Sequence, residues 1–239
     1  MSGSGWTYPP MLAAPNHAVQ RAIGDLTTAE RKAAVKMMGT SRAKARALPA
    51  PMPDVVELLD RYYPSADFEV KMDGIRGMVE WDGKHVRILN RKGDNITDRC
   101  VELATAVRDA GLKPFILDGE IVLSGALTDP PTSRFPDVTK RIATDPKRVS
   151  STERELNPLA FVAFDCLRYA DLDHVQVQTP HQDRAGMARV LVEVIENFHP
   201  VRRAVNPLIW AQVVAEGLEG LIVKDRKGVY RPGARSEAW

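Results

Sequence analysis

The amino-acid sequence predicts an α+β fold in which antiparallel sheets are flanked by helices. Three observations lead to this prediction. Apolar strand-like runs follow one another at hairpin spacing, separate helical segments interrupt them, and the glycine-rich motifs of doubly wound folds are missing. Neither a GxGxxG nor a GxxxxGK[ST] pattern occurs, so neither a Rossmann site nor a P-loop is supported.

The N-terminal part of the chain is predicted to be a helical extension that precedes the main domain. Residues 17–38 have a helical pattern, with Thr27 and Glu30 at the spacing of a capping box. Three prolines within residues 48–54 indicate a linker, because proline ends helices and stiffens extended chain. We therefore expect an N-terminal helical extension with a proline-rich linker at 1–53 and a single main domain at 54–239.

The main domain alternates between short helices and strand pairs. A short amphipathic helix is predicted at 54–63. Strands are predicted at 68–71, 77–82, 85–90, 115–123, 159–169 and 220–225, and further helices at 98–112, 181–198 and 210–217. The second and third strands are joined at Asp82-Gly83, a dipeptide that favours two-residue hairpin turns.

Composition indicates a soluble globular protein that can bury a substantial core, with 44% hydrophobic and 27% charged residues among 239. Residues 1–50 hold seven Lys or Arg against two acids, while the remainder holds 26 against 29. This basic arm suits a polyanionic partner and equally suits a solvated helix face. Cys100 and Cys166 lie far apart, which favours reduced thiols. No apolar run is long enough to span a membrane, and the start lacks a signal peptide, so we expect a cytoplasmic protein.

The first segment that indicates chemistry is Lys71-Met72-Asp73-Gly74-Ile75-Arg76. The lysine stands where an apolar strand runs into a tight Asp-Gly turn. A lysine held at such a place becomes a nucleophile when burial and neighbouring cations favour its neutral amine. A surface turn with charged flanks is the competing structural interpretation.

Two further apolar strands carry charges that need partners. Glu120 lies inside the strand at 115–123, Glu219 directly precedes the strand at 220–225, and Lys224 lies within it. Burying a charge costs on the order of several kcal/mol unless the charge is paired or bound to a metal. Together with the lysine and arginine of the first segment, these residues predict one shared Mg²⁺–nucleotide site. Structural ion pairs are the alternative.

The ordered set KMDGIR, RKGD, LDGEIV, FVAFDCL, EGLIVK and VYRPGARSEAW resembles the motifs of the ATP-dependent DNA ligases, over roughly residues 66–239. RNA ligases and mRNA capping enzymes share the KxDG, DGE and EGxxxK elements. The YxPGxRSxxW pattern at 230–239 is similar to that of DNA ligases specifically, and Arg76 favours the ATP-dependent over the NAD-dependent enzymes. The resemblance implies a nucleotidyltransferase (adenylation) domain.

The resemblance implies a role for each matching residue. Lys71 would attack the α-phosphate of ATP and become covalently bonded to AMP. The remaining roles are adenine recognition by Glu69, contacts to the nucleotide and the DNA 5′-phosphate by Arg76 and Arg91, ribose or metal binding by Glu120, adenine stacking by Phe164, metal binding by Glu219 and α-phosphate contact by Lys224. An aromatic residue in an apolar strand also fits the core, and Asp73 and Asp118 also fit structural roles in their turns.

The resemblance further implies ATP and Mg²⁺ as cofactors and nicked double-stranded DNA as partner, with AMP passing from lysine to the 5′-phosphate before the 3′-hydroxyl seals the strand. We expect a monomer without membrane contact. The family pattern continues beyond the position of Trp239 with a Lys-x-Lys pair and an OB-fold, so we expect slow self-adenylation, weak salt-sensitive DNA binding and inefficient sealing by this chain alone.

Two departures and two alternatives accompany the resemblance. Gly228 stands where the family often has a small hydroxyl residue, and a short element similar to Pro9–Ala13 usually lies closer to the nucleophile. The alternative enzyme is another covalent nucleotidyltransferase, namely an RNA ligase or a GTP-using capping enzyme. The alternative from a different class is a nucleic-acid- or nucleotide-binding module without catalysis.

Overall fold

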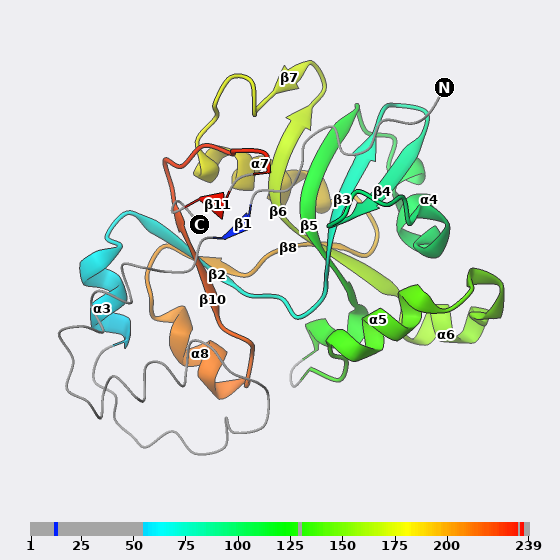
Figure 1. The fold of residues 1–239 in the computed structure, drawn as a ribbon, viewed down its shortest axis with the longest axis horizontal. Coiled ribbons are helices and arrows are strands. Elements are labelled where there is room, and N and C mark those ends of the chain that lie inside the picture. Colours follow the sequence, from blue (N-terminus) through cyan, green and yellow to red (C-terminus); the bar gives the residue numbers. More distant parts are fainter. Residues whose placement is uncertain (1–11, 14–54, 129–130, 234, 237–239) are drawn as a thin grey trace.

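A computed structural model of the chain describes residues 12–13, 55–128, 131–233 and 235–236. Within these residues, two antiparallel sheets lie side by side and helices cover their outer faces (Figure 1). The smaller sheet is on the left of Figure 1 and the larger sheet on the right. The predicted α+β class is confirmed. The predicted extension and linker at 1–53 lie outside the described residues, apart from a two-residue strand at 12–13.

The larger sheet has the strand order β4-β3-β5-β6-β7, and β8 pairs with β6. Its members are β3 (Ile75–Trp81), β4 (Val86–Asn90), β5 (Phe115–Leu123), β6 (Leu159–Tyr169), β7 (Leu172–Asp173) and β8 (Phe198–Pro200). All of its strand pairs are antiparallel except β6 with β8. Trp81 pairs with Val86, so the hairpin predicted at Asp82-Gly83 is present, and the bounds of β6 match the prediction.

The smaller sheet has the order β10-β2-β9, with β10 (Leu221–Asp225) and β9 (Arg203–Ala204) on either side of β2 (Ala66–Val70). Helices α3 (Val55–Tyr62) and α8 (Ile209–Ala215) cover one face of this sheet through a buried apolar cluster. A short parallel pair joins β1 (Leu12–Ala13) to β11 (Arg235–Ser236). The chain crosses from the smaller to the larger sheet between β2 and β3, at the KMDG segment.

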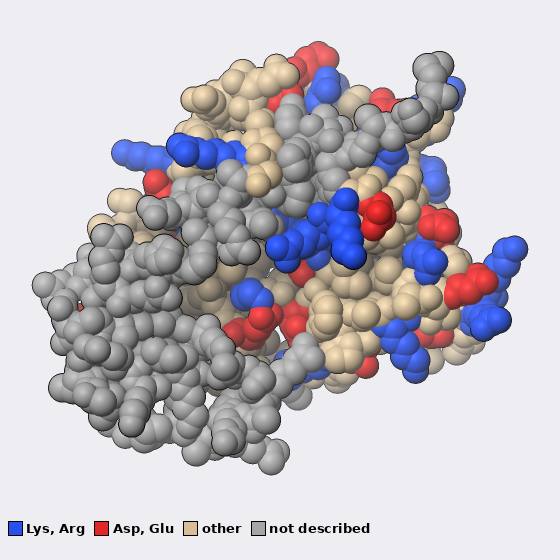
Figure 2. Space-filling view, in the orientation of Figure 1, with Lys and Arg blue, Asp and Glu red and all other residues tan. Residues whose placement is uncertain are grey.

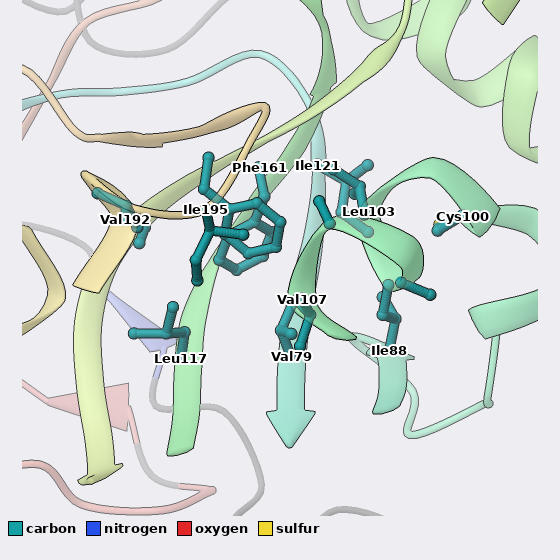
Figure 3. Packing of buried hydrophobic residues seen from close by; sticks show 14 of the residues in the cluster. Val79, Ile88, Cys100, Leu103, Val107, Leu117, Ile121, Phe161, Val192 and Ile195 are labelled. Carbon is teal, nitrogen blue, oxygen red and sulfur yellow. The ribbon is translucent and has the colours of Figure 1, made fainter. Parts of the chain in front are cut away.

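The main core fills the space between the larger sheet and two helices, α4 (Val101–Asp109) and α7 (His181–Val192). Alternate residues of the strands point into it, because side chains in a strand alternate between its two faces. Leu117 and Ile121 of β5 and Leu103 of α4 are all fully buried there (Figure 3). Full burial of such a side chain contributes about 2 kcal/mol, so this face supplies a large share of the stability.

Two helices were not predicted, and two are clearly shorter than predicted. The helix predicted at 98–112 is limited to Val101–Asp109. Helices α5 (Phe135–Ala143) and α6 (Ser151–Leu156) lie in the connection between β5 and β6, together with the 3₁₀ turns η2 (Ser124–Leu127) and η3 (Pro146–Arg148). A further 3₁₀ turn, η1 (Thr97–Arg99), precedes α4. Helix α7 ends at Val192 rather than at 198, because the chain turns at Asn197 with a φ of 60° and enters β8 beside β6.

Two further expectations concern the cysteines and membrane-spanning helices. Cys100 and Cys166 are both buried and free, as the sequence predicts. Burial raises the pKa of both thiols well above the usual range, so neither is a reactive thiolate. In the part of the chain that the structure describes, no helix has both the length and the apolar character needed to cross a membrane.

Candidate active site

The predicted nucleophile lies in the connection between β2 and β3. The Lys71 amide donates to the carbonyl of Gly220 at 2.9 Å, which fixes the turn against the start of β10. Its ammonium forms an ion pair with the carboxylate of Glu219, 148 residues away along the chain. Both side chains are accessible, with exposed fractions of 42% and 43%. The fold therefore brings the predicted nucleophile and a predicted metal-binding carboxylate together at an open place.

Two glycines allow the backbone to pack closely around this turn. A Cβ atom at Gly74 would lie 2.4 Å from the carbonyl oxygen of Ile121, and one at Gly119 would lie 2.5 Å from that of Val162. Real side chains do not tolerate such distances, so both positions need glycine. The Asp-Gly pairs of the KMDG and LDGE motifs thus have a steric cause, which is the tight packing of three strands beneath the site.

The face of the larger sheet that points away from the main core carries charges. Arg76 forms a bidentate pair with the fully buried Asp118, with both nitrogen–oxygen distances at 2.7 Å, and the Tyr230 hydroxyl donates to the same carboxylate at 2.7 Å. Burial disfavours the charged guanidinium, but Asp118 outweighs it and raises the pKa of Arg76. Asp118 therefore anchors Arg76 rather than facing a ligand.

Glu120 lies opposite Arg76 in the register of β3 and β5. The charges of Lys71 and Glu219 at the nucleophile turn both influence its pKa. Burial raises the pKa of Glu120 to about 7, with smaller upward contributions from Asp118 and Glu219 that oppose the effect of Arg76 and Lys71. Such coupling is expected of charges gathered in one site. Glu120 can therefore exchange a proton near neutral pH.

Phe164 stands at an irregularity in β6. The β5–β6 register shifts between Asp118/Asp165 and Gly119/Ala163, so Phe164 is the extra residue of a bulge. Its half-buried ring lies 4.5 Å from the Arg76 guanidinium carbon and 4.6 Å from the Lys224 ammonium, both measured to the ring centroid. Each cation–π contact contributes about 1 kcal/mol. The Phe164 ring therefore contacts two of the cations that are predicted to bind phosphate.

The smaller sheet contributes Glu69 and Lys224, which are both buried. The Lys224 ammonium lies 2.7 Å from Oε2 of Glu69, and Nε2 of His181 lies 3.1 Å from Oε1. Burial would raise the pKa of Glu69, but Lys224 and then the His181 hydrogen bond outweigh it and hold the pKa below the usual value. Both oxygens of Glu69 are thus engaged within the protein.

One predicted site residue stays apart from these contacts. Arg91 is exposed at the turn that follows β4, next to Asn90, which pairs with Gly77. Among the described residues, no ion pair or hydrogen bond joins it to the cluster. On the face seen in Figure 2, basic and acidic side chains are visible in the hollow between the two sheets.

The sequence interpretation missed four residues that hold the site together, namely Asp165, His181, Arg184 and Tyr230. Asp165 could have been found, because it is a charge inside the apolar run of β6 and so needed a partner. That partner is Arg184, which binds both carboxylate oxygens at 2.7 and 3.1 Å. Arg184 outweighs the effect of burial and lowers the pKa of Asp165. His181 carries no comparable signal in the sequence.

The carboxylates of the site could hold a metal together with a bound nucleotide. Within the described residues, no three His, Cys, Asp or Glu side chains converge as a metal-binding group. Mg²⁺ commonly binds through one or two carboxylates together with substrate phosphates and water. Glu120 and Glu219, which influence each other electrostatically, therefore suit a nucleotide-bound Mg²⁺.

Comparison with known sequences identifies the family. The family described as "ATP dependent DNA ligase domain" matches residues 46–239. The chain belongs to this ligase family. A "Probable DNA ligase" of Streptomyces griseus is 34% identical over 194 residues, and "DNA ligase 2" of Haloquadratum walsbyi is 29% identical over 198. These alignments cover 77% and 81% of this chain but 37% and 31% of the relatives, so the chain spans about a third of their length.

Solved structures agree with the ligase fold. "Mycobacterial DNA ligase D complexed with ATP and MES" is 26% identical with a TM-score of 0.59, over 73% of this chain and 52% of that chain. "Pmar-Lig_PreS3", at 16% identity and a TM-score of 0.54, supports the fold alone. The ligase domain described here thus has the architecture that its sequence motifs predict.

Proposed function

We propose that this ligase domain forms a covalent lysyl-AMP intermediate from ATP at Lys71. The observation that carries the proposal is the convergence of Lys71 and Glu219 with Arg76, Glu120 and the Phe164–Lys224 pair, which come from both sheets. An accessible lysine beside carboxylates and buried cations has the composition needed for phosphoryl transfer. Apolar packing alone would not require this set.

The proposed first step is an in-line displacement at the α-phosphorus of ATP. A bond forms between the Lys71 nitrogen and phosphorus, and the bond to the pyrophosphate oxygen breaks. The amine must lose a proton before it attacks, and that proton can pass to solvent, to which the 42% exposed Lys71 side chain is open. Arg76 and Lys224 would neutralise phosphate oxygens, while Phe164 would stack on adenine once the base displaces a cation from its ring.

Mg²⁺ is part of the proposal, with Glu120 and Glu219 as its protein ligands. A bound Mg²⁺ would supply charge neutralisation at the transferring phosphate. Glu69 would contribute to adenine recognition. Because its side chain is buried, it would do so by fixing the position of the end of β2.

The later steps also belong to the proposal, because the chain spans about a third of its named relatives. AMP would pass to the 5′-phosphate of nicked double-stranded DNA, with the exposed Arg91 as a contact to that phosphate. The 3′-hydroxyl would then displace AMP. We propose that the domain acts as a monomer in the cytoplasm, where ATP is available, and that efficient sealing requires an OB-fold.

Labelling with α-³²P-ATP and Mg²⁺, followed by a denaturing gel, tests the proposal. Wild type and Lys84→Ala, an exposed lysine in the β3–β4 hairpin, should carry label, whereas Lys71→Ala should carry none. Label of equal yield on Lys71→Ala would contradict the mechanism. Label from GTP instead of ATP would favour a capping enzyme, and no label on any protein would favour the non-catalytic binding module.

A further inference from the structure

A fully buried histidine lies close to carboxylates of both sheets. His181 is the first residue of α7, which packs on the larger sheet, yet its Nε2 lies 3.1 Å from Glu69 on the smaller sheet. Its Nδ1 lies 3.6 Å from Asp165 on β6, and Nε2 is 3.9 Å from Asp67 on β2. The imidazole is thus placed among three buried carboxylates from two different sheets.

Two of these carboxylates have other cationic partners. Asp165 is held bidentately by Arg184, one turn further along α7. Asp67 pairs with Arg203 at 3.1 Å and with Arg226 at 3.6 Å. Since both acids are neutralised without it, His181 is not required to balance their charge.

Glu69 differs, because its two oxygens divide between two partners. Oε2 binds the Lys224 ammonium at 2.7 Å, and Oε1 meets Nε2 of His181. The separation of 3.1 Å is within hydrogen-bonding range, whereas the 3.6 Å separation on the Asp165 side is beyond it. Of the three carboxylates around the ring, Glu69 is therefore the closest to His181. This contact orients the carboxylate toward Lys224, which lies 4.6 Å from the centre of the Phe164 ring.

We propose that His181 is a positioning residue for ATP binding, which acts by holding Glu69 so that Glu69 keeps the Lys224 ammonium at one defined place in the site. This inference rests on the proposed function, in which Lys224 meets the α-phosphate and Phe164 meets adenine. A buried carboxylate held at one oxygen alone can rotate, and its ammonium partner then loses a defined place. His181 thus connects α7 to nucleotide affinity without touching the nucleotide.

Two substitutions separate the two nitrogens of the imidazole. In His181→Gln the amide nitrogen reaches the position of Nε2 and can still donate to Glu69. In His181→Asn the shorter amide reaches only the position of Nδ1, on the Asp165 side. We expect the dissociation constant of α,β-methylene-ATP, a probe that cannot transfer AMP, to rise about tenfold in His181→Asn and to stay within about threefold of wild type in His181→Gln. Calorimetric titration of the full chain measures both.

A matched control and a second route keep the test decisive. His174 is also buried and bonds Thr179 at 3.0 Å, so His174→Asn should leave the dissociation constant unchanged. If His181→Asn does not fold, Glu69→Gln tests the same link from the other side and should weaken binding by about the same factor. In a Lys224→Ala background the effect of His181→Asn should vanish, because the path to the nucleotide is already broken.

Some outcomes would overturn the positioning role of His181, and a different one would overturn the proposed function. Equal weakening by His181→Gln and His181→Asn, or unchanged binding in folded His181→Asn, would overturn the positioning role. Additive effects of the His181 and Lys224 substitutions would also overturn it, because they would indicate two separate influences. A wild-type chain that binds no ATP analogue at all would instead overturn the proposed function on which the inference rests.

Discussion

The two faces of the larger sheet are built from the same strands but are stabilised differently. Along β5, Leu117 and Ile121 point into the apolar core, while Asp118 and Glu120 point toward the site. The apolar face is stabilised by close packing, so a side chain there can be replaced by another apolar side chain of similar volume. The charged face is held by specific pairs, and each carboxylate needs its own cation.

This difference is clearest where β5 and β6 meet. Asp118 and Asp165 are paired across the strands, an arrangement that would be repulsive without neutralisation. Arg76 reaches the first from β3, and Arg184 reaches the second from α7. The lesson is that the functional face is arranged by long-range ion pairs, while the opposite face is arranged by local alternation of apolar residues.

The largest expected effect comes from breaking a pair on the charged face. Arg184→Ala leaves the fully buried Asp165 without its bidentate partner and should lower the free energy of unfolding by about 3–5 kcal/mol. Arg189→Ala on the same helix is the control, because Arg189 is 68% exposed and should cost no more than about 0.5 kcal/mol. Urea unfolding measures both, and equal costs would contradict the proposed dependence on pairing.

On the apolar face, a cavity should affect stability but not chemistry. Leu103→Ala in α4 removes a fully buried side chain and should cost about 3 kcal/mol. The yield of AMP adduct per folded molecule should remain that of wild type. Leu156→Ala, at a position that is 80% exposed, should change little. A loss of labelling in folded Leu103→Ala would show that the two faces are not separable.

Glu120 gives the charged face a pH dependence. Its pKa is raised to about 7 in the folded chain from 4.5 when unfolded, so its stabilising contribution is complete below pH 4.5 and is lost as pH rises through 7. The stability of wild type relative to Glu120→Gln should therefore fall by about 2 kcal/mol over that interval. Urea titrations of both proteins between about pH 5 and pH 8 measure the difference. Parallel pH profiles would rule out the raised pKa.

The smallest expected changes in stability come from replacing two glycines that have different surroundings. Gly74→Ala places a Cβ 2.4 Å from a backbone oxygen and should destabilise by at least about 1 kcal/mol. Gly186→Ala in α7 meets no atom within 4 Å and should stabilise by about 0.5–1 kcal/mol, because alanine is the better helix former. Thermal unfolding of the two variants should shift in opposite directions, and shifts of the same sign would contradict the steric explanation.

Much of the fold could be predicted from local pattern. The apolar run at 159–169 gives β6 its bounds, and Asp82-Gly83 gives the hairpin. The end of α7 could not be predicted, because the parallel pairing of β8 with β6 depends on contacts far apart in the sequence. The helices α5 and α6 lie in a segment interrupted by prolines, including Pro136 in the first turn of α5, which conceals their short periodicity.

The site was predictable as a set of residue types but not as a set of contacts. Glu120, Glu219 and Lys224 were selected because charges near apolar strands need partners, yet the sequence does not say which partners. Lys224 forms an ion pair with Glu69 on the neighbouring strand, and Glu69 also contacts His181 from α7. Such links join three elements that only the tertiary fold brings together.

The position of AMP attachment tests the central claim most directly. After incubation with ATP and Mg²⁺, the chain would be digested at neutral or alkaline pH, which preserves phosphoramidate bonds, and the peptides analysed by tandem mass spectrometry. We predict AMP on Lys71, the accessible lysine paired with Glu219. AMP on Lys224 or on another lysine, or no modified peptide from a chain that binds ATP, would contradict the account.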